Sequence, residues 1–146
     1  MQQISRSKLI KKLDGVFSEY IRLRDSDANW YVTCPLCGSK IHWKKAQNMH
    51  FISRAVLKYR YDEDNCHAGC VRCNVILHGN YIVYTRRMQT RYGIDRVDAM
   101  IKDKSLYKIS TPDLLDMFYD YRNKAQYLEA ILDIRENCAD IKKLRC

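Results

Sequence analysis

Two C-x-x-C pairs constrain the fold of this chain more than any other feature of its sequence. The first pair is Cys34 and Cys37, and the second is Cys70 and Cys73. A two-residue spacer lets each pair turn back onto one ion, and four thiolates make the tetrahedral ligand set of a structural Zn²⁺ site. Two unrelated redox pairs are the alternative, but a redox motif would be expected within a βαβ pattern that this sequence lacks. We therefore predict a structural zinc site formed by these four cysteines.

Length and charge limit the size of the fold and the class of partner. The chain has 146 residues, with 26 Lys and Arg against 17 Asp and Glu, which gives a net charge of +9. This length suits one compact domain, which we divide into a lead-in (1–33), a zinc-binding core (34–80) and a helical extension (81–146). The positive charge favours a polyanionic partner and gives affinity without sequence selectivity.

Seven cysteines would also suit a secreted disulfide protein, but the N-terminus argues against secretion. Met1-Gln-Gln-Ile-Ser-Arg-Ser lacks the apolar core of a signal peptide, and no apolar run reaches transmembrane length. We expect a cytoplasmic protein with no membrane partner. Cys66 is expected to be buried in a strand, whereas Cys138 and Cys146 are read as ordinary helix and tail cysteines.

Apolar spacing and capping signals predict an α+β fold with a helical C-terminal region. Ser5 or Ser7 can cap a first helix that ends near Arg24, and Thr111-Pro112-Asp113 is a strong start signal for a long helix to about Asn137. The long helix has a broad apolar stripe, which suggests a homodimer. The other expected elements are strands at 30–33, 41–43, 46–53 and from 65, a helix at 70–78 that starts in the second cysteine pair, and helices at 81–92 and 95–104.

Several short motifs resemble the NinG/Rap recombination proteins of lambdoid phages. They are His50-Phe-Ile-Ser-Arg54, Tyr59-Arg-Tyr-Asp62, the run from Asn65 to Asn74, and Tyr92-Gly93. The resemblance covers roughly residues 9 to 130 and implies an HNH-type, ββα-metal nuclease with a zinc site of four cysteines. It also implies DNA, in branched or recombination intermediates, as the substrate.

The resemblance assigns the site residues. His50 is the general base, Asn65 braces the hairpin that carries it, Asn74 binds a catalytic Mg²⁺ or Mn²⁺, and Arg54 holds the phosphate. His78 lies one helical turn after Asn74, so we expect it to face the same ion, although a capping role before Gly79 is the alternative.

One departure from the family pattern concerns the metal shell. Some zinc-bearing nucleases of this class have an Asp just before the catalytic His, and this chain has Met49, which is a poor ligand for Mg²⁺. Asp62 or Asp64 could complete the shell instead. His67 is expected to point toward the active site, and His42 is read as a surface residue.

The side chains expected to contact DNA are Arg54, Lys44, Lys45, Lys58, Arg60 and Arg72.

The resemblance, together with the cysteine pairs and the positive charge, thus predicts a metal-dependent DNA endonuclease of phage recombination, with a host-cytoplasmic location if the chain is phage-encoded. The alternative is a non-catalytic, zinc-containing DNA-binding recombination mediator, in which the fold is retained and the incomplete ligand set no longer cuts. Met49 favours this alternative, whereas the combination of His50, Arg54 and Asn74 opposes it.

Overall fold

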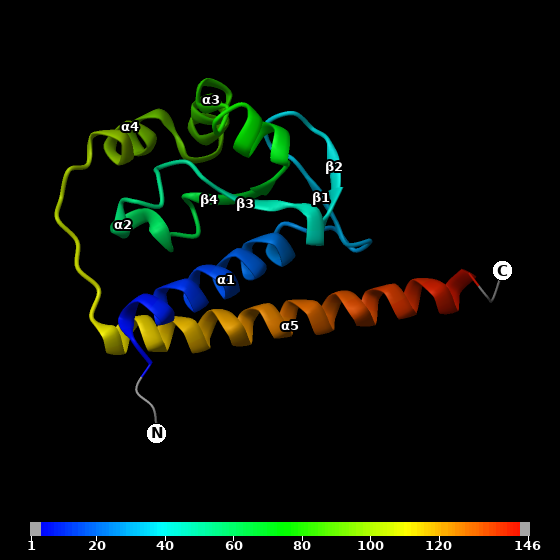
Figure 1. Ribbon diagram of the computed structural model, residues 1–146. Coiled ribbons are helices and arrows are strands. Elements are labelled where there is room, and N and C mark those ends of the chain that lie inside the picture. The colour runs from blue at the N-terminus through cyan, green and yellow to red at the C-terminus, as the bar shows by residue number, and fades with distance from the viewer. Residues whose placement is uncertain (1–3, 144–146) are drawn as a thin grey trace.

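A computed structural model describes residues 4–143 of the chain, with side chains through residue 138. It has the expected α+β architecture, with two small antiparallel sheets and one long C-terminal helix (Figure 1). The elements are α1 (Arg6–Arg24), β1 (Tyr31–Thr33), β2 (Lys40–His42), η1 (Trp43–Lys45), β3 (Gln47–His50), α2 (Leu57–Arg60), β4 (Cys66–Gly69), η2 (Arg72–Ile76), α3 (Tyr81–Tyr92), α4 (Ile94–Lys102) and α5 (Thr111–Lys143). Within the described residues, no helix is long and apolar enough to span a bilayer.

Helices α1 and α5 lie side by side in the same direction and form the base of the molecule (Figure 1). The predicted cap is present, because the Ser5 hydroxyl accepts a hydrogen bond from the Lys8 amide. The apolar stripe of α1 is buried, and the ring of Phe17 packs edge-on against Tyr121 of α5 with centroids 4.7 Å apart. Burial of this stripe supplies the larger hydrophobic core.

The start and end of α5 differ from the prediction. Ser110, not Thr111, is the cap, because Ser110 and Asp113 exchange side-chain and backbone hydrogen bonds in a capping box. The helix continues past Asn137 to Lys143. The indole of Trp30 donates to Glu136 at 2.6 Å and so anchors the distal half of α5. Residues 144–146 of the basic tail, including Cys146, lie outside the described residues.

The hairpin of β3 and β4 has two faces with different neighbours. Its register pairs Met49 with His67 and His50 with Cys66. Because side chains alternate along a strand, Asn48 and His50 face the side of α1, whereas Met49 faces α3. The strand is shorter than the predicted 46–53, because the Asn65 side chain takes the backbone bonds of Ile52 in place of a ladder partner.

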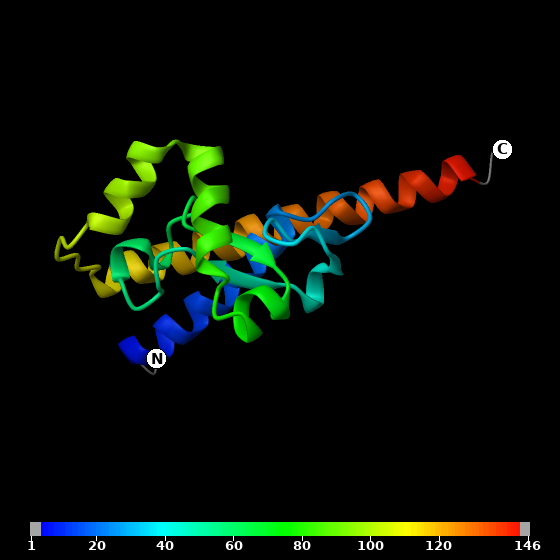
Figure 2. The ribbon, with the colours of Figure 1, turned by 90° about the horizontal axis from the view of Figure 1, so that it is seen from above.

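Two hydrophobic clusters flank this hairpin. The first contains the inward residues of α1 and α5, with Cys66 and Ala68 from β4. The second contains three of the four paired cysteines, Met49, and the inward residues of α3 and α4. Helices α3 and α4 lie above the hairpin, on the side away from α1 and α5 (Figure 1). The view from above shows that they follow one another directly (Figure 2). The observed α4 begins one residue earlier and ends two residues earlier than the predicted 95–104.

Candidate metal centre and catalytic cleft

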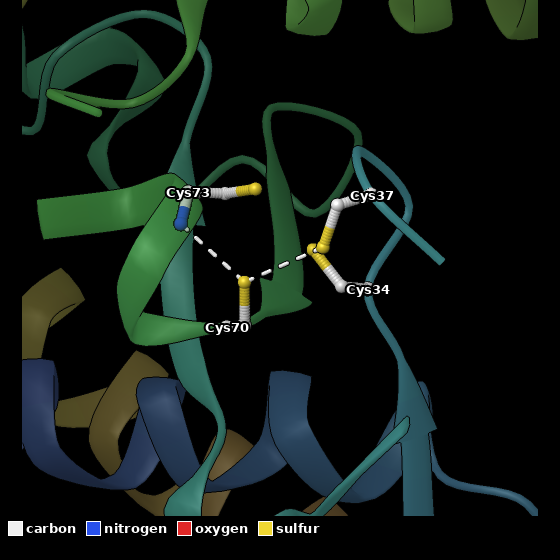
Figure 3. Close-up of side chains that lie close together, drawn as sticks. All are labelled: Cys34, Cys37, Cys70 and Cys73. Carbon is white, nitrogen blue, oxygen red and sulfur yellow. Dashed lines mark hydrogen bonds between the residues drawn. The ribbon is translucent and has the colours of Figure 1, made fainter. Parts of the chain in front are cut away.

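The four paired cysteines come together in one cluster, as the sequence predicts. Cys34 and Cys37 lie in the loop after β1, and Cys70 and Cys73 follow β4 (Figure 3). All four Sγ atoms lie within 4.8 Å of one another, and those of Cys37 and Cys70 are 3.6 Å apart. A tetrahedron with Zn–S bonds of about 2.3 Å has S···S edges of about 3.8 Å. The cluster can therefore bind a metal ion such as zinc.

Local hydrogen bonds prepare these thiols for a cation. The Cys73 amide donates to Cys70 Sγ at 3.3 Å, and the Asn80 side-chain amide donates to Cys73 Sγ at 3.8 Å. Hydrogen bonds from the side chain and backbone of Ser39 lower the pKa of Cys37 to about 6. Such donors favour the thiolate, which is the form that binds metal. At Cys34 and Cys73 burial outweighs the donors and raises the pKa of the thiol. The six cysteines with described side chains are all free thiols.

Met49 and Gly69 connect the cysteine cluster to the hairpin. Met49 is fully buried. A Cβ added at Gly69 would lie 2.3 Å from its Cε, 2.6 Å from its Sδ and 3.3 Å from Cys34 Sγ. A side chain at position 69 would therefore force the tip of the buried Met49 side chain to move. Since Met49 points away from His50, it takes no part in a metal shell on the His50 side.

A cleft of about 630 Å³ lies on the other face of β3, where α1, η2 and the start of α3 approach one another. It gathers His50, Arg54, Asn74 and His78, four of the five residues to which the sequence assigned a catalytic or metal-binding role in the nuclease site. The remaining lining residues are Asp14, Phe17, Ser18, Asn48, Phe51, Ser53, Arg60, Gly79, Tyr81 and Tyr84.

His50 ends β3, and its ring is oriented by the backbone. Nε2–H donates to the carbonyl oxygen of Arg60 at 2.9 Å, which leaves Nδ1 as the unprotonated nitrogen. Burial lowers the pKa of His50 by more than the hydrogen bond to Arg60 raises it, and the nearby charge of Arg54 lowers it further. The imidazole is therefore neutral near pH 7 and has a lone pair available for a proton.

Asn65 lies directly before β4 and is completely buried. Its Oδ1 accepts from the Ile52 amide at 2.7 Å, and its Nδ2 donates to the carbonyls of Ile52 and Tyr59, each at 2.9 Å. These bonds close the segment between the two strands. Because His50 is hydrogen-bonded to Arg60 in the same segment, Asn65 makes the contacts that bracing His50 requires.

Asn74 and Asn48 line the cleft, and Gln47 of β3 contacts Asn74 from beside it. Asn74 donates through Nδ2 to Gln47 Oε1 at 2.7 Å, which leaves its Oδ1 as the free acceptor. Asn48 Oδ1 is the buried side-chain oxygen that has no hydrogen-bond partner in the described part of the chain. An orphaned buried carbonyl indicates a place where water or a ligand supplies the missing partner. Gln47 and Asn48 were not identified from the sequence, because an Asn or Gln in a strand gives no local signal.

The helix predicted at 70–78 is shorter and wider than expected. A π-helical turn, η2, covers Arg72–Ile76, with a bond from the Leu77 amide to the Arg72 carbonyl. His78, Gly79 and Asn80 then all have positive φ, at 48°, 85° and 44°. His78 is thus not on a helical turn above Asn74, yet the reversal returns it to the cleft. Left-handed non-glycine residues are uncommon and concentrate at functional sites.

Asp14 of α1 is the carboxylate on the cleft wall, and no pattern in the sequence indicated it. Both its oxygens accept from the Arg60 guanidinium, Oδ1 at 2.8 Å and Oδ2 at 2.5 Å, and Oδ1 also accepts from Tyr61 at 2.9 Å. Burial alone would raise the pKa of Asp14, but these hydrogen bonds lower it overall. Arg60, predicted to contact DNA, is therefore committed to a fork-like ion pair.

The two carboxylates proposed from the sequence to complete the metal shell are elsewhere. Asp62 Oδ1 accepts from the amides of Asp64 and Asn65 in a turn, and Asp64 pairs with Arg96 at 2.6 Å. Neither lines the cleft. Arg54 does line it and is exposed, and within the described residues it has no carboxylate partner.

The other basic side chains that were expected to contact DNA do not line the cleft. Lys44 and Lys45 lie in η1, and Lys58 is paired with Asp103. Arg72 is exposed at the start of η2. The expectation for His67 was wrong: it points away from the cleft and hydrogen-bonds the hydroxyls of Tyr84 and Tyr92, because its partner in the register is Met49.

The cleft fits a divalent metal only in part. Asn74 Oδ1 and a ring nitrogen of His78 are suitable ligand atoms, but neither brings a negative charge, and Asp14 is engaged by Arg60. Mg²⁺ prefers carboxylate and phosphate oxygens. Within the described residues, the cysteine cluster is the sole group of three or more His, Cys, Asp or Glu side chains with metal-binding spacing. A metal here would need oxygens from the substrate phosphate.

Comparison with known proteins places the sequence among phage proteins. The family described as bacteriophage lambda NinG protein matches residues 2–130. Protein ninG of Salmonella phage P22 is 28% identical over 132 residues, which are 90% of this chain and 60% of that protein. Protein ninG of Escherichia phage lambda is 25% identical over the same shares of both chains. The chain thus spans about 60% of the length of these curated relatives. No solved structure matches it.

Proposed function

This chain belongs to the bacteriophage lambda NinG family, and we propose that it is a metal-dependent DNA endonuclease that acts in phage recombination. The observation that carries the proposal is the cleft, in which a neutral, oriented histidine lies beside an unpaired arginine and an asparagine with a free carbonyl oxygen. The hairpin, the second cysteine pair and η2 would then form a ββα-metal core of the HNH type, with Zn²⁺ on the four cysteines as its structural ion.

In this mechanism His50 takes a proton from water. The bond from Nε2–H to the Arg60 carbonyl fixes the tautomer, so Nδ1 receives the proton. The same carbonyl then stabilises the imidazolium that forms, since Nε2–H stays bonded to it. The oxygen of the deprotonated water attacks phosphorus, and the sugar oxygen leaves on the opposite side. Asn65 acts as a positioning residue, because it fixes the segment that supplies the Arg60 carbonyl.

The phosphate is held by charge. Arg54 offers a planar donor set to two phosphate oxygens. Asn74 and His78 would hold the Mg²⁺ or Mn²⁺ ion, which supplies positive charge for the phosphate and the leaving oxygen when bound. The hydrogen bond to Gln47 holds the Nδ2 amide of Asn74 and so leaves the Asn74 Oδ1 atom free to bind the ion.

The test is cleavage of a labelled four-way junction and a duplex of equal length, with Mg²⁺, Mn²⁺ or EDTA. We expect wild type to cut with metal and His50→Ala to bind DNA but not cut. His42→Ala, which changes an unrelated histidine, is the matched control and should cut normally. Equal cutting by wild type and His50→Ala would refute the role of His50. Absence of cutting in every condition, with DNA binding intact, would refute the endonuclease.

The second candidate is a non-catalytic, zinc-containing DNA-binding recombination mediator. One observation favours it: the cleft offers no uncommitted carboxylate to a metal, because Asp14 is bound by Arg60 and Tyr61. The same junction assay separates the two candidates, because a mediator would bind the junction without cutting it.

We also propose a homodimer through the exposed apolar side chains of α5, such as Tyr127 and Ile134, which sedimentation of the purified protein would test.

A further inference from the structure

The segment that forms one wall of the cleft carries an unusual exposed apolar surface. Six large apolar or aromatic side chains within twelve residues are solvent-exposed, although the hydrophobic clusters lie close by. They are Val71, Val75, Ile76, Leu77, Tyr81 and Ile82, which we call the η2–α3 ridge. Ile82 and Ile76 are the most open, at 72% and 66% exposure. A concentration of exposed apolar side chains in one short segment indicates a contact site.

The charge around the ridge indicates what contacts it. From Asn65 to Ile94 the chain has no Asp or Glu, although it carries Arg72, Arg86, Arg87 and Arg91. In the described part of the chain, none of these four arginines forms an ion pair. Thirty residues without a carboxylate, in a protein of net charge +9, suit a polyanion better than a typical protein partner.

Tyr81 gives the ridge an aromatic platform at the cleft itself. Its ring stacks on Phe51 with an interplanar angle of 3° and centroids 5.3 Å apart. Phe51 is buried and follows His50 directly, so the stack is anchored beside the proposed base. Tyr81 nevertheless stays 48% exposed and lines the cleft. Its hydroxyl has no hydrogen-bond partner among the described residues, unlike that of Tyr84.

We propose that the η2–α3 ridge binds unpaired nucleobases next to the phosphate held in the cleft, with one base stacked on Tyr81 and neighbouring bases against Ile82 and Ile76. Tyr81 and Ile82 are then the residues by which the ridge distinguishes unstacked bases from continuous duplex. Bases in a duplex are stacked on each other, so their faces cannot reach the ridge. This inference rests on the proposed function for the phosphate in the cleft.

The test measures binding without cleavage, so that its outcome is separate from the endonuclease question. The zinc-loaded full chain, in buffer without added Mg²⁺ or Mn²⁺, is titrated into a fork with 2-aminopurine at an unpaired branch position and into a paired duplex of equal length. Tyr81→Ala and Ile82→Ser are compared with wild type. Leu106→Ser and Tyr107→Ala change side chains that are at least as exposed, in the segment between α4 and α5, and serve as controls.

We expect wild type to prefer the fork and to quench 2-aminopurine. Tyr81→Ala should lose about 5- to 150-fold in affinity for the fork, the range for one base–aromatic stack, with duplex affinity unchanged. Ile82→Ser, which removes an open side chain and keeps the fold, should lose part of the preference. The controls should behave as wild type. The proposal is overturned if both ridge variants bind the fork like wild type, or if they lose fork and duplex affinity equally.

Discussion

Replacement of Asn65 gives the sharpest test of how the hairpin is held. Asn65→Ala leaves the Ile52 amide and the Ile52 carbonyl without partners, whereas the Tyr59 carbonyl keeps a bond from the Tyr61 amide. Two orphaned groups at about 1–3 kcal/mol each give a loss of about 4 kcal/mol. For a domain of this size, that lowers Tm by about 12 °C.

Asn65→Asp separates hydrogen bonding from shape. The new carboxyl keeps the acceptor for Ile52 N–H, but its second oxygen faces the carbonyls of Ile52 and Tyr59. Only the protonated form can donate there, so its pKa in the folded state lies above the unfolded value. A raised carboxyl pKa means that stability present below about pH 4 is lost as pH rises toward the folded pKa. The variant should therefore approach wild type in acid and fall behind it at pH 7.

Thermal and urea unfolding between pH 4 and pH 8 measure both effects. Asn29→Asp, in an exposed turn, is the matched control and should show no such pH dependence. A loss below about 1 kcal/mol for Asn65→Ala would refute the argument that these bonds hold the hairpin. A pH-independent difference between Asn65→Asp and wild type would refute the geometry assigned to the amide.

Four further predictions follow from the site. Cys37→Ser should lower bound zinc well below one ion per chain by atomic absorption and reduce Tm, whereas Cys138→Ser on exposed α5 should change neither. Gly69→Ala should lower the free energy of unfolding by about 1–3 kcal/mol, because the new Cβ clashes with Met49. Gly15→Ala has open space in α1 and should raise the free energy of unfolding by up to about 1 kcal/mol. Unfolding curves equal to that of wild type would contradict both expectations. The rate of cleavage should fall in acid, with a midpoint below pH 6.5, because burial lowers the pKa of His50 and only the neutral ring accepts a proton. A midpoint above pH 7 would contradict this expectation. Asp14→Asn should be less stable than wild type at pH 7, and the difference should shrink below about pH 4. The folded state lowers the pKa of Asp14, so the stability that this carboxylate contributes is lost as it is protonated. A difference in the free energy of urea unfolding that stays constant with pH would contradict this expectation.

Residues that act through local spacing could be predicted, and residues that act through tertiary contact could not. The cysteine pairs, the stripe of α1 and the start signal of α5 are patterns within a few residues, and the structure confirms all three in outline. The family motifs also placed His50, Arg54 and Asn74 in one cleft. Asp14 is 46 residues from Arg60 in sequence, so nothing near either residue indicates their ion pair.

The misplacement of His67 has a clear physical cause. His67 was expected to face the active site from strand alternation alone. The register pairs Met49 with His67, so the face that carries His67 is the face that carries the cysteine cluster. Sequence alternation says which residues share a face, but not which face meets α1. That choice depends on the packing of α1 against Cys66 and Ala68, a contact across more than forty residues.

The same alternation couples the metal centre to the cleft. Met49 packs on the cysteine cluster, and its neighbours Asn48 and His50 line the opposite face of the same short strand. At the far end of the cluster, Asn80 donates to Cys73 and begins α3, which presents Tyr81 to the cleft. A metal bound by the four thiolates would thus hold both walls at once. Loss of the metal should release β3 and the start of α3 together, and we expect cleavage and fork binding to disappear in parallel when zinc is removed.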